Sequence, residues 1–129
     1  DPDGQGLPPG GFDVALASNV VHATDDIGRS LARLWRLVKP GGAVVLNEVT
    51  AVQTFATLTF GLTDGWWAFR DGPARLPNAP LLDVPRWTAA LAAAGFPTAE
   101  ATGLPGETDP ARFAQAVIVA HRDARPVPE

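Results

Sequence analysis

The sequence lacks the residues that several classes of protein require. It has no cysteine among its 129 residues, which excludes disulfide bonds and thiolate metal sites. It has only two histidines, so we expect no bound metal. No run of lysine and arginine occurs and the net charge is −4, so we expect neither nucleic acid nor an anionic membrane surface as a partner.

Long apolar runs and targeting signals are absent as well. Every apolar run is far shorter than the roughly 20 residues that span a bilayer. The N-terminus does not show the order of charged, apolar and small residues that marks a secretion signal. We therefore expect a cytoplasmic location. Methionine is missing even at position 1, from which we expect the chain to begin inside a longer protein.

What the sequence does contain fits one α/β domain. Hydrophobic residues make up 46% and charged residues 19%, as is typical of a globular protein. The length supports one hydrophobic core and is too short for two. The pattern predicts a loop over 1–11, a strand–helix–strand unit over 12–50, an aromatic-rich segment and lid loop over 51–85, a helix and C-terminal strands over 86–122, and a fraying tail over 123–129.

The strand–helix–strand unit has the clearest pattern. Residues 12–17 and 43–49 predict two parallel strands, and the continuous apolar run over 12–17 predicts a strand covered on both faces. Between them, apolar residues recur at steps of three and four, which predicts an amphipathic helix. We expect Thr24 or Asp25 to cap this helix and the KPGG motif at 39–42 to end it. Its arginines should face water: Arg29, Arg33 and Arg36.

Polar side chains follow both strands of this unit. Ser18, Asn19 and His22 come after the first strand, and Asn47 and Glu48 lie at the end of the second. In an open α/β sheet, ligands bind outside the carboxyl ends of the parallel strands. This end of the sheet is therefore the candidate site, and adjacent strand ends bring His22 and Glu48 within reach of each other.

The second half of the chain is less regular. Residues 50–71 predict either one broken helix or a helix and a turn, with a wide apolar face. Residues 72–85 form a proline-rich loop that exceeds the usual length of a connection, which favours a lid or substrate loop. A helix over 85–94 follows, and strands are predicted over 96–104 and 113–121. Asp83 should cap this helix and Gly95 should end it.

The chain resembles the C-terminal half of a class I S-adenosylmethionine-dependent methyltransferase, and more specifically the C-methyltransferase domain of modular polyketide synthases. The KPGG motif is general to class I methyltransferases, whereas SNVVHAT together with FGLTDGWW is much more specific. The resemblance covers nearly the whole chain. It rests on DPDGQGLPPGGFDVALASNVVHAT (1–24), LARLWRLVKPGGAVVLNEVT (31–50), TFGLTDGWWAFRD (59–71), PLLDVPRWTAALAAAGF (80–96) and QAVIVAH (115–121).

The chain departs from this family at the cofactor site. A complete domain opens with a strand and a glycine-rich loop that hold the cofactor, and no such loop follows a strand here. The resemblance therefore implies a truncated Rossmann-like methyltransferase fold of about four strands, in family order 4-5-7-6, with the last strand antiparallel. We expect no cofactor for this chain, although S-adenosylmethionine serves the complete family domain. The strand over 12–17 would then have an open edge, which we expect a loop, a homodimer or neighbouring synthase domains to cover.

The resemblance also implies a chemistry. In the family, a histidine removes the α-proton of a β-ketoacyl chain bound through phosphopantetheine to an acyl carrier protein, and a glutamate orients that histidine. The matching residues are His22 and Glu48. A histidine with its usual pKa of about 6.5 is a suitable base near neutral pH. Asn19 would hold the enolate oxygen, and the acyl channel would be lined by Phe60, Trp66 and Trp67.

Other interpretations remain open. His22 can be a structural histidine, Glu48 a solvated strand-end residue, Asn19 a turn residue, and the tryptophans parts of the core. Three functions follow. The chain is a truncated domain that scaffolds its neighbours or transfers an α-proton, the C-terminal piece of an active C-methyltransferase, or a non-catalytic module for dimerisation or interaction.

Overall fold

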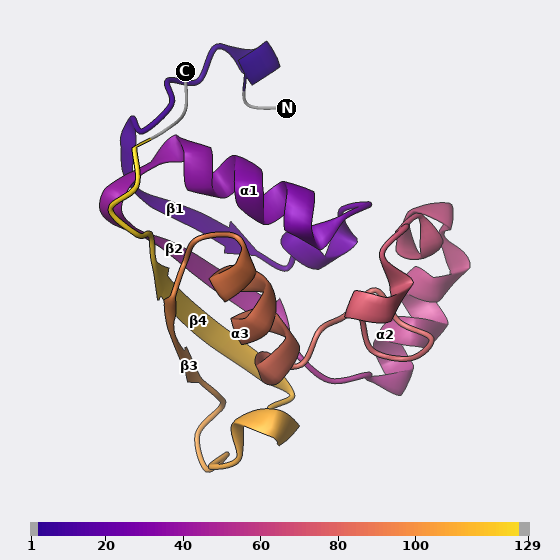
Figure 1. The fold of residues 1–129 in the computed structure, drawn as a ribbon. Coiled ribbons are helices and arrows are strands. Elements are labelled where there is room, and N and C mark those ends of the chain that lie inside the picture. The colour runs from indigo at the N-terminus through magenta and orange to yellow at the C-terminus, as the bar shows by residue number, and fades with distance from the viewer. Residues whose placement is uncertain (1–2, 127–129) are drawn as a thin grey trace.

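Four strands form one mixed sheet in the computed structural model, which describes residues 3–126 (Figure 1). The strands are β1 (Phe12–Ser18), β2 (Val38–Val49), β3 (Thr98–Thr102) and β4 (Gln115–His121). Their order across the sheet is β1-β2-β4-β3. β1 and β2 are parallel, whereas β4 is antiparallel to both of its neighbours. The predicted α/β class, strand order and antiparallel last strand are therefore confirmed.

Helix α1 (Ile27–Leu37) connects the two parallel strands, and its cap differs from the prediction. Asp26 is the N-cap, since its Oδ1 accepts the backbone N–H of Arg29 at 2.7 Å. Asp25 pairs with the Arg29 side chain instead, and the Thr24 hydroxyl donates to the Val21 carbonyl. The caps predicted from the sequence are thus one and two residues early.

The arginines of α1 differ in exposure. Arg29 is exposed as predicted, but Arg33 and Arg36 are half-buried. Long arginine stems can lie along apolar surface while the charged head stays near water, which explains partial burial on a short helix.

The KPGG motif belongs to a strand, where the sequence predicted a helix end. α1 ends at Leu37 and β2 begins at Val38. The register shifts inside the motif, because Phe12 pairs with Val38 and Val14 pairs with Ala43, which makes a bulge in β2. Glycine is needed there, since a Cβ on Gly42 would lie 2.7 Å from the Asp13 carbonyl oxygen.

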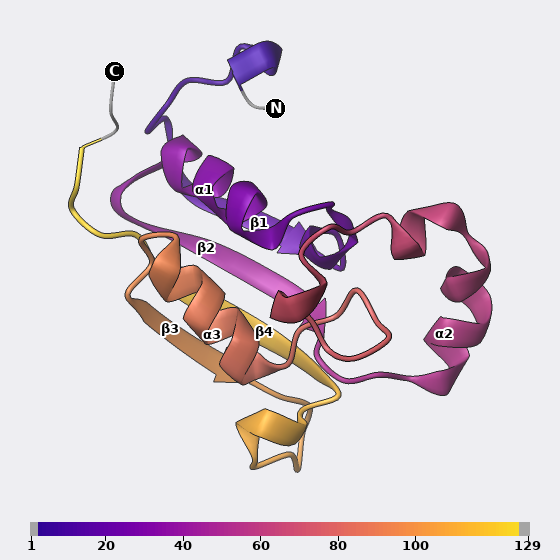
Figure 2. The same ribbon diagram turned by 45° about the vertical axis from the view of Figure 1, so that its right-hand side comes forward.

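Helix α3 (Val84–Ala93) follows its predicted signals closely. Asp83 accepts the backbone N–H of Arg86 at 3.0 Å, and Gly95 has the left-handed φ of +98° that ends a helix. Trp87 is fully buried in the core. Figure 2 shows α1 and α3 side by side on one face of the sheet.

The opposite face and the β1 edge are open in the part of the chain that the structure describes. β1 pairs only with β2, and Val14 and Leu16 are 55% and 74% exposed. Val117 on β4 is also exposed. The prediction that β1 is covered on both faces is therefore wrong for residues 3–126. No described loop covers its edge, while a dimer and neighbouring domains stay predictions.

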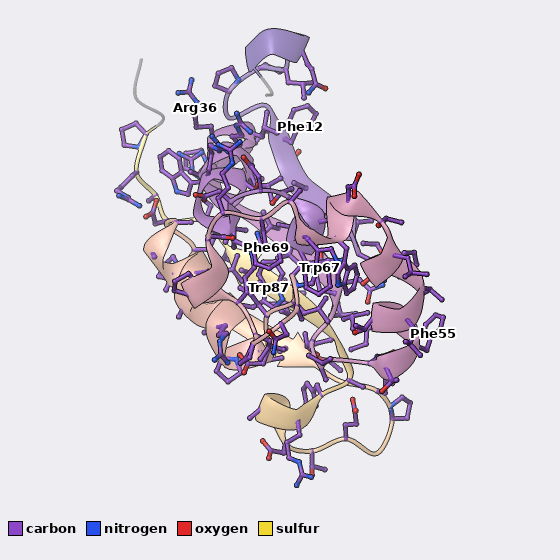
Figure 3. All side chains as sticks on the ribbon, turned by 90° about the vertical axis from the view of Figure 1, so that its right-hand side faces the viewer. Phe12, Arg36, Phe55, Trp67, Phe69 and Trp87 are labelled. Atoms are coloured by element: carbon purple, nitrogen blue, oxygen red, sulfur yellow. The ribbon has the colours of Figure 1, made fainter. Side chains whose placement is uncertain are left out.

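The aromatic-rich segment is a short helix followed by turns, the second of the two predicted alternatives. Helix α2 (Thr54–Thr59) is followed by 3-10 turns over Phe60–Leu62 and Asp64–Trp67. Its predicted apolar face is largely exposed at Phe55, Leu58 and Leu62. In Figure 3, Phe55 lies at the outer margin of the molecule, whereas Trp87 lies near its middle.

The proline-rich loop packs against the domain. Arg75, Leu81 and Leu82 are all buried, and a single 3-10 turn covers Gly72–Ala74. This loop therefore packs against the domain and does not stand free as a lid, while its predicted function as a substrate loop stays a prediction.

The start of the C-terminal tail is bound to Trp35 of α1, whereas the sequence predicted that the tail frays. The Trp35 indole N–H donates to Asp123 at 3.2 Å, and the Arg122 guanidinium lies 3.8 Å from the Trp35 ring centre. The Arg125 guanidinium stacks on the same ring at 5.3 Å. The rest of the predicted tail, residues 127–129, lies outside the described residues. No helix within residues 3–126 has the length and apolar composition to cross a membrane.

Candidate functional site

His22 and Glu48 meet at the carboxyl end of the parallel strands. His22 lies in a 3-10 turn (Val21–Ala23) just after β1, and Glu48 lies near the end of β2. The His22 Nδ1 contacts Glu48 Oε2, and Glu48 Oε1 accepts the backbone N–H groups of Val20 and Val21 at 3.3 and 3.0 Å. Glu48 is fully buried and His22 is 7% exposed. The carboxylate therefore fixes both the ring and the turn that carries it.

This contact determines where the histidine proton lies. An ionised carboxylate only accepts hydrogen bonds, so Nδ1 of a neutral His22 is the protonated nitrogen. Nε2 then carries the lone pair. No residue described in the structure hydrogen-bonds to Nε2, and His22 lines a cavity. The pair thus has the proton arrangement of a general base with an orienting carboxylate.

The cavity beside His22 has a volume of about 520 Å³ and is mostly apolar. Phe60 stacks on Trp66 with ring centres 5.9 Å apart. Trp66 in turn meets the His22 ring edge-on at 6.2 Å. The remaining apolar wall comes from the turn after β1, the end of β2, helix α2 and the proline-rich loop: Ala23, Val49, Phe55, Ala56, Pro80 and Leu81. This lining suits an acyl chain better than a charged ligand.

Asn19 lies at the polar side of the same cavity. It has a left-handed φ of +49°, its backbone N–H donates to the Asn47 carbonyl at 2.7 Å, and its side-chain oxygen accepts the Val49 N–H at 3.0 Å. These bonds fix the side chain and leave its NH₂ group as the donor available to a ligand. Both the turn function and the ligand function predicted for Asn19 are therefore compatible with its position.

Two residues predicted near the site, Trp67 and Asn47, do not line the cavity. Trp67 is 45% exposed, does not line the cavity, and donates its indole N–H to the Gly61 carbonyl at 2.8 Å. The prediction that Trp67 lines the acyl channel is therefore wrong, because the side chains of neighbouring residues leave the 3-10 turn in different directions. The Asn47 amide is bound to Ser18 and Gln115 and does not line the cavity either.

Sequence reasoning missed several lining residues. Gln115 begins β4 and pairs with Val49 at the end of β2, so it reaches the site once the antiparallel pairing is known. Gln53 precedes α2, and its amide lies 3.4 Å from the Ala114 carbonyl. Pro80 and Leu81 come from the proline-rich loop, whose length predicted a lid or substrate loop, but no sequence signal singles out these two residues.

The site offers little to a cation. Among the described residues, no carboxylate other than the buried Glu48 lies in contact with His22, and both Glu48 oxygens are already bound. Within residues 3–126, histidine and acidic side chains form no group of three or more that can hold a metal ion.

The chain is similar to methyltransferases of polyketide synthases. A family model described as a methyltransferase domain matches residues 3–46. The polyketide synthase ThaG of Burkholderia thailandensis is 43% identical over 95 residues, which are 74% of this chain and 2% of that protein. The crystal structure of the DszA carbon methyltransferase matches with a TM-score of 0.87 and 40% identity, covering 97% of this chain and 32% of that one.

A second solved structure shows what such a neighbour binds. The trans-methyltransferase CalH, solved in complex with SAH, matches with a TM-score of 0.80 and 31% identity, over 95% of this chain and 33% of that one. The chain thus spans about a third of the length of these solved methyltransferases.

Proposed function

We propose that the chain, which is similar to methyltransferases of polyketide synthases, removes the α-proton of a β-ketoacyl thioester through its His22–Glu48 pair. One observation supports this most: a buried carboxylate binds Nδ1 and leaves Nε2 without a partner among the described residues, beside an apolar cavity. In the proposal, an acyl carrier protein presents the thioester on its phosphopantetheine arm, and neighbouring synthase domains surround the site.

The proton transfer balances without a co-reactant. The Cα–H bond breaks, the proton moves to His22 Nε2, and the electron pair delocalises onto the β-keto and thioester oxygens as an enolate. Glu48 stabilises the imidazolium that forms, and the Asn19 NH₂ donates to the enolate oxygen. Return of the proton from Nε2 regenerates the keto form. A positioned general base contributes about 10²- to 10⁴-fold to such a step.

The residues of this chain do not fit the methyl donor. The methyltransferase family uses S-adenosylmethionine, and the family pattern holds its ribose with a carboxylate and its methionine with a glycine-rich loop. In the part of the chain that the structure describes, no carboxylate lines the cavity, and Glu48 is fully bound by His22 and two backbone N–H groups. The proposed activity of the chain on its own is therefore enolisation, with scaffolding of neighbouring domains as its non-catalytic form.

Deuterium exchange tests the proposal. The purified chain should accelerate α-proton exchange of a β-ketoacyl pantetheine thioester in D₂O, measured by NMR against a protein-free background. His22→Ala should lose the acceleration. His121→Ala is the matched control, because His121 is exposed at the end of β4, away from the cavity. Equal rates for the wild type and His22→Ala would contradict the catalytic proposal and leave the scaffold.

A second candidate function is that the chain is the C-terminal part of an active carbon methyltransferase. The open β1 edge, with Leu16 exposed, and the match to a third of a solved carbon methyltransferase favour it. Adding the nucleotide-binding part of a similar enzyme as a separate chain should then produce α-methylated thioester from S-adenosylmethionine. Failure of the two chains to associate would count against this candidate.

A further inference from the structure

We propose that Asp71 and Arg75 are positioning residues that hold the His22 turn and the cavity wall in one fixed arrangement. This inference rests on the proposed function of His22 as the base. Neither residue lines the cavity, so both act through the residues that they bind.

Arg75 is buried directly behind the site. Its side chain is fully shielded from water, and one nitrogen, Nη1, donates both to the His22 carbonyl at 2.6 Å and to the Pro80 carbonyl at 2.7 Å. The other terminal nitrogen, Nη2, donates to the Thr24 carbonyl at 2.7 Å. A guanidinium is planar and rigid, so these bonds fix two backbone segments, the His22–Thr24 turn and the loop at Pro80, relative to one another.

Asp71 completes the connection to helix α1. One of its carboxylate oxygens accepts from Arg75 Nε, and the other accepts the backbone N–H of Ile27, the first residue of α1, at 2.7 Å. Phe69 lies on the same loop, and the centre of its ring is 4.8 Å from the guanidinium carbon of Arg75. The pair therefore joins the loop, the His22 turn and the start of α1.

The His22 turn is held from both ends as a result. Glu48 binds the N–H groups that precede the histidine, and Arg75 binds the histidine's own carbonyl. Pro80, which Arg75 also holds, lines the cavity. The base and the wall that faces a bound acyl chain thus share one anchor, and a displacement of about 1 Å in such an arrangement can cost about 100-fold in rate.

Stability alone is a weak reason for this pair. The desolvation of two charges offsets much of their attraction, so a buried ion pair often adds little net stability compared with apolar residues of similar size. Arg75 donates three hydrogen bonds to backbone carbonyls around the proposed base and not to distant parts of the core, which fits a positioning function.

Chemical rescue tests the inference. Arg75→Ala should lower kcat for α-proton exchange about 100-fold while KM for the thioester changes little. Millimolar guanidinium should restore the rate by occupying the vacated space, whereas methylammonium, which lacks the planar fork, should not. Arg86→Ala is the matched control, because Arg86 forms an exposed pair with Asp83 on α3 and should keep the wild-type rate.

A spectroscopic measurement keeps the inference testable apart from activity. Only two histidines are present, so the His22 imidazole signals can be compared with those of His121 in the same NMR spectrum. In Arg75→Lys and Asp71→Asn, which keep most of the side-chain volume, the His22 signals should broaden or split while those of His121 stay unchanged.

The outcomes separate the two proposals. A wild-type chain without exchange above background overturns the proposed function, while the NMR comparison still decides whether Asp71 and Arg75 order the turn. A folded Arg75 variant with the wild-type exchange rate and an unchanged His22 signal overturns the positioning function. Loss of exchange that guanidinium does not restore, with unperturbed His22 signals in the Arg75→Lys and Asp71→Asn variants, also overturns it.

Discussion

Glu48 contacts Nδ1 of His22, and in the proposed function this contact sets the tautomer of the histidine. Glu48→Gln should lower α-proton exchange about 100-fold or more, because an amide can donate to Nδ1 and so favours the tautomer with its proton on Nε2. The exchange rate measures this directly. Glu100→Gln, at an exposed position of β3, is the control. A Glu48→Gln protein that is folded and exchanges at the wild-type rate would contradict the proposed function of Glu48.

Asn19 supplies the second prediction at this scale. Asn19→Asp keeps the oxygen that accepts the Val49 N–H and tolerates the left-handed φ, but it replaces the NH₂ donor with an acceptor. We expect a loss of roughly 100-fold in exchange rate with little change in unfolding free energy. Asn78→Asp is matched, because Asn78 is exposed and has a φ of +56°. Equal exchange rates in the two variants would assign Asn19 to the turn alone.

The main residues of the candidate site could be predicted from the sequence because they lie at the ends of predicted strands. His22, Glu48 and Asn19 lie where two adjacent parallel strands finish, and the structure brings all three to one site. Trp67 was misplaced because adjacent side chains leave a 3-10 turn in different directions. Arg75 was not found because its partners are backbone carbonyls of residues distant in sequence, which leave no side-chain pattern.

At the scale of elements, helix α1 carries a pH-dependent contact at its start. A hydrogen bond from Arg29 lowers the pKa of Asp25 below its usual value of 3.8, against a smaller opposing effect of desolvation. Because the folded-state pKa is lowered, this stabilisation is present above pH 3.8 and is lost as the pH falls through the folded pKa. The pair is exposed, so its effect on stability near neutral pH should be small.

Carboxyl NMR titration measures this contact. The midpoint for Asp25 should lie below 3.8 in the wild type and move up toward that value in Arg29→Gln. An Asp25 midpoint that does not change on removal of Arg29 would show that the contact is not populated in solution.

The elements themselves were predictable where local signals agree with packing. The fully buried Trp87, the Asp83 cap and Gly95 define α3 from the sequence alone. The KPGG motif contains the residues of a helix end, yet strand pairing with β1 extends β2 through it. Segment 51–71 has helical spacing but little burial to stabilise one long helix, so it breaks into α2 and two turns.

At the scale of the whole molecule, the half-covered sheet dominates the expected behaviour. Both α1 and α3 lie on one face, and within residues 3–126 no strand pairs with the outer edge of β1 (Figures 1 and 2). We predict that the purified chain self-associates through this edge, as measured by light scattering after size exclusion. Leu16→Lys should make it monomeric with little change in unfolding free energy, since Leu16 is mostly exposed.

Leu104→Lys is the control for this prediction. Leu104 is also exposed, but it lies in the loop after β3 at the other side of the sheet. The Leu104→Lys substitution should leave the oligomeric state unchanged. A wild-type chain that stays monomeric at high concentration, with its β1 amides exchanging freely with solvent, would contradict the expectation that the edge is covered.

In the proposed function, one fixed base, His22 Nε2, takes and returns the α-proton. The most direct measurement uses a 2-methyl-3-oxoacyl pantetheine thioester of single configuration in D₂O and compares deuterium incorporation with racemisation at C2. A base on one side of the cavity delivers deuterium to the face from which it removed the proton, so incorporation should outpace racemisation with the wild type and equal it with His22→Ala. Equal rates of incorporation and racemisation with the wild type would contradict the account.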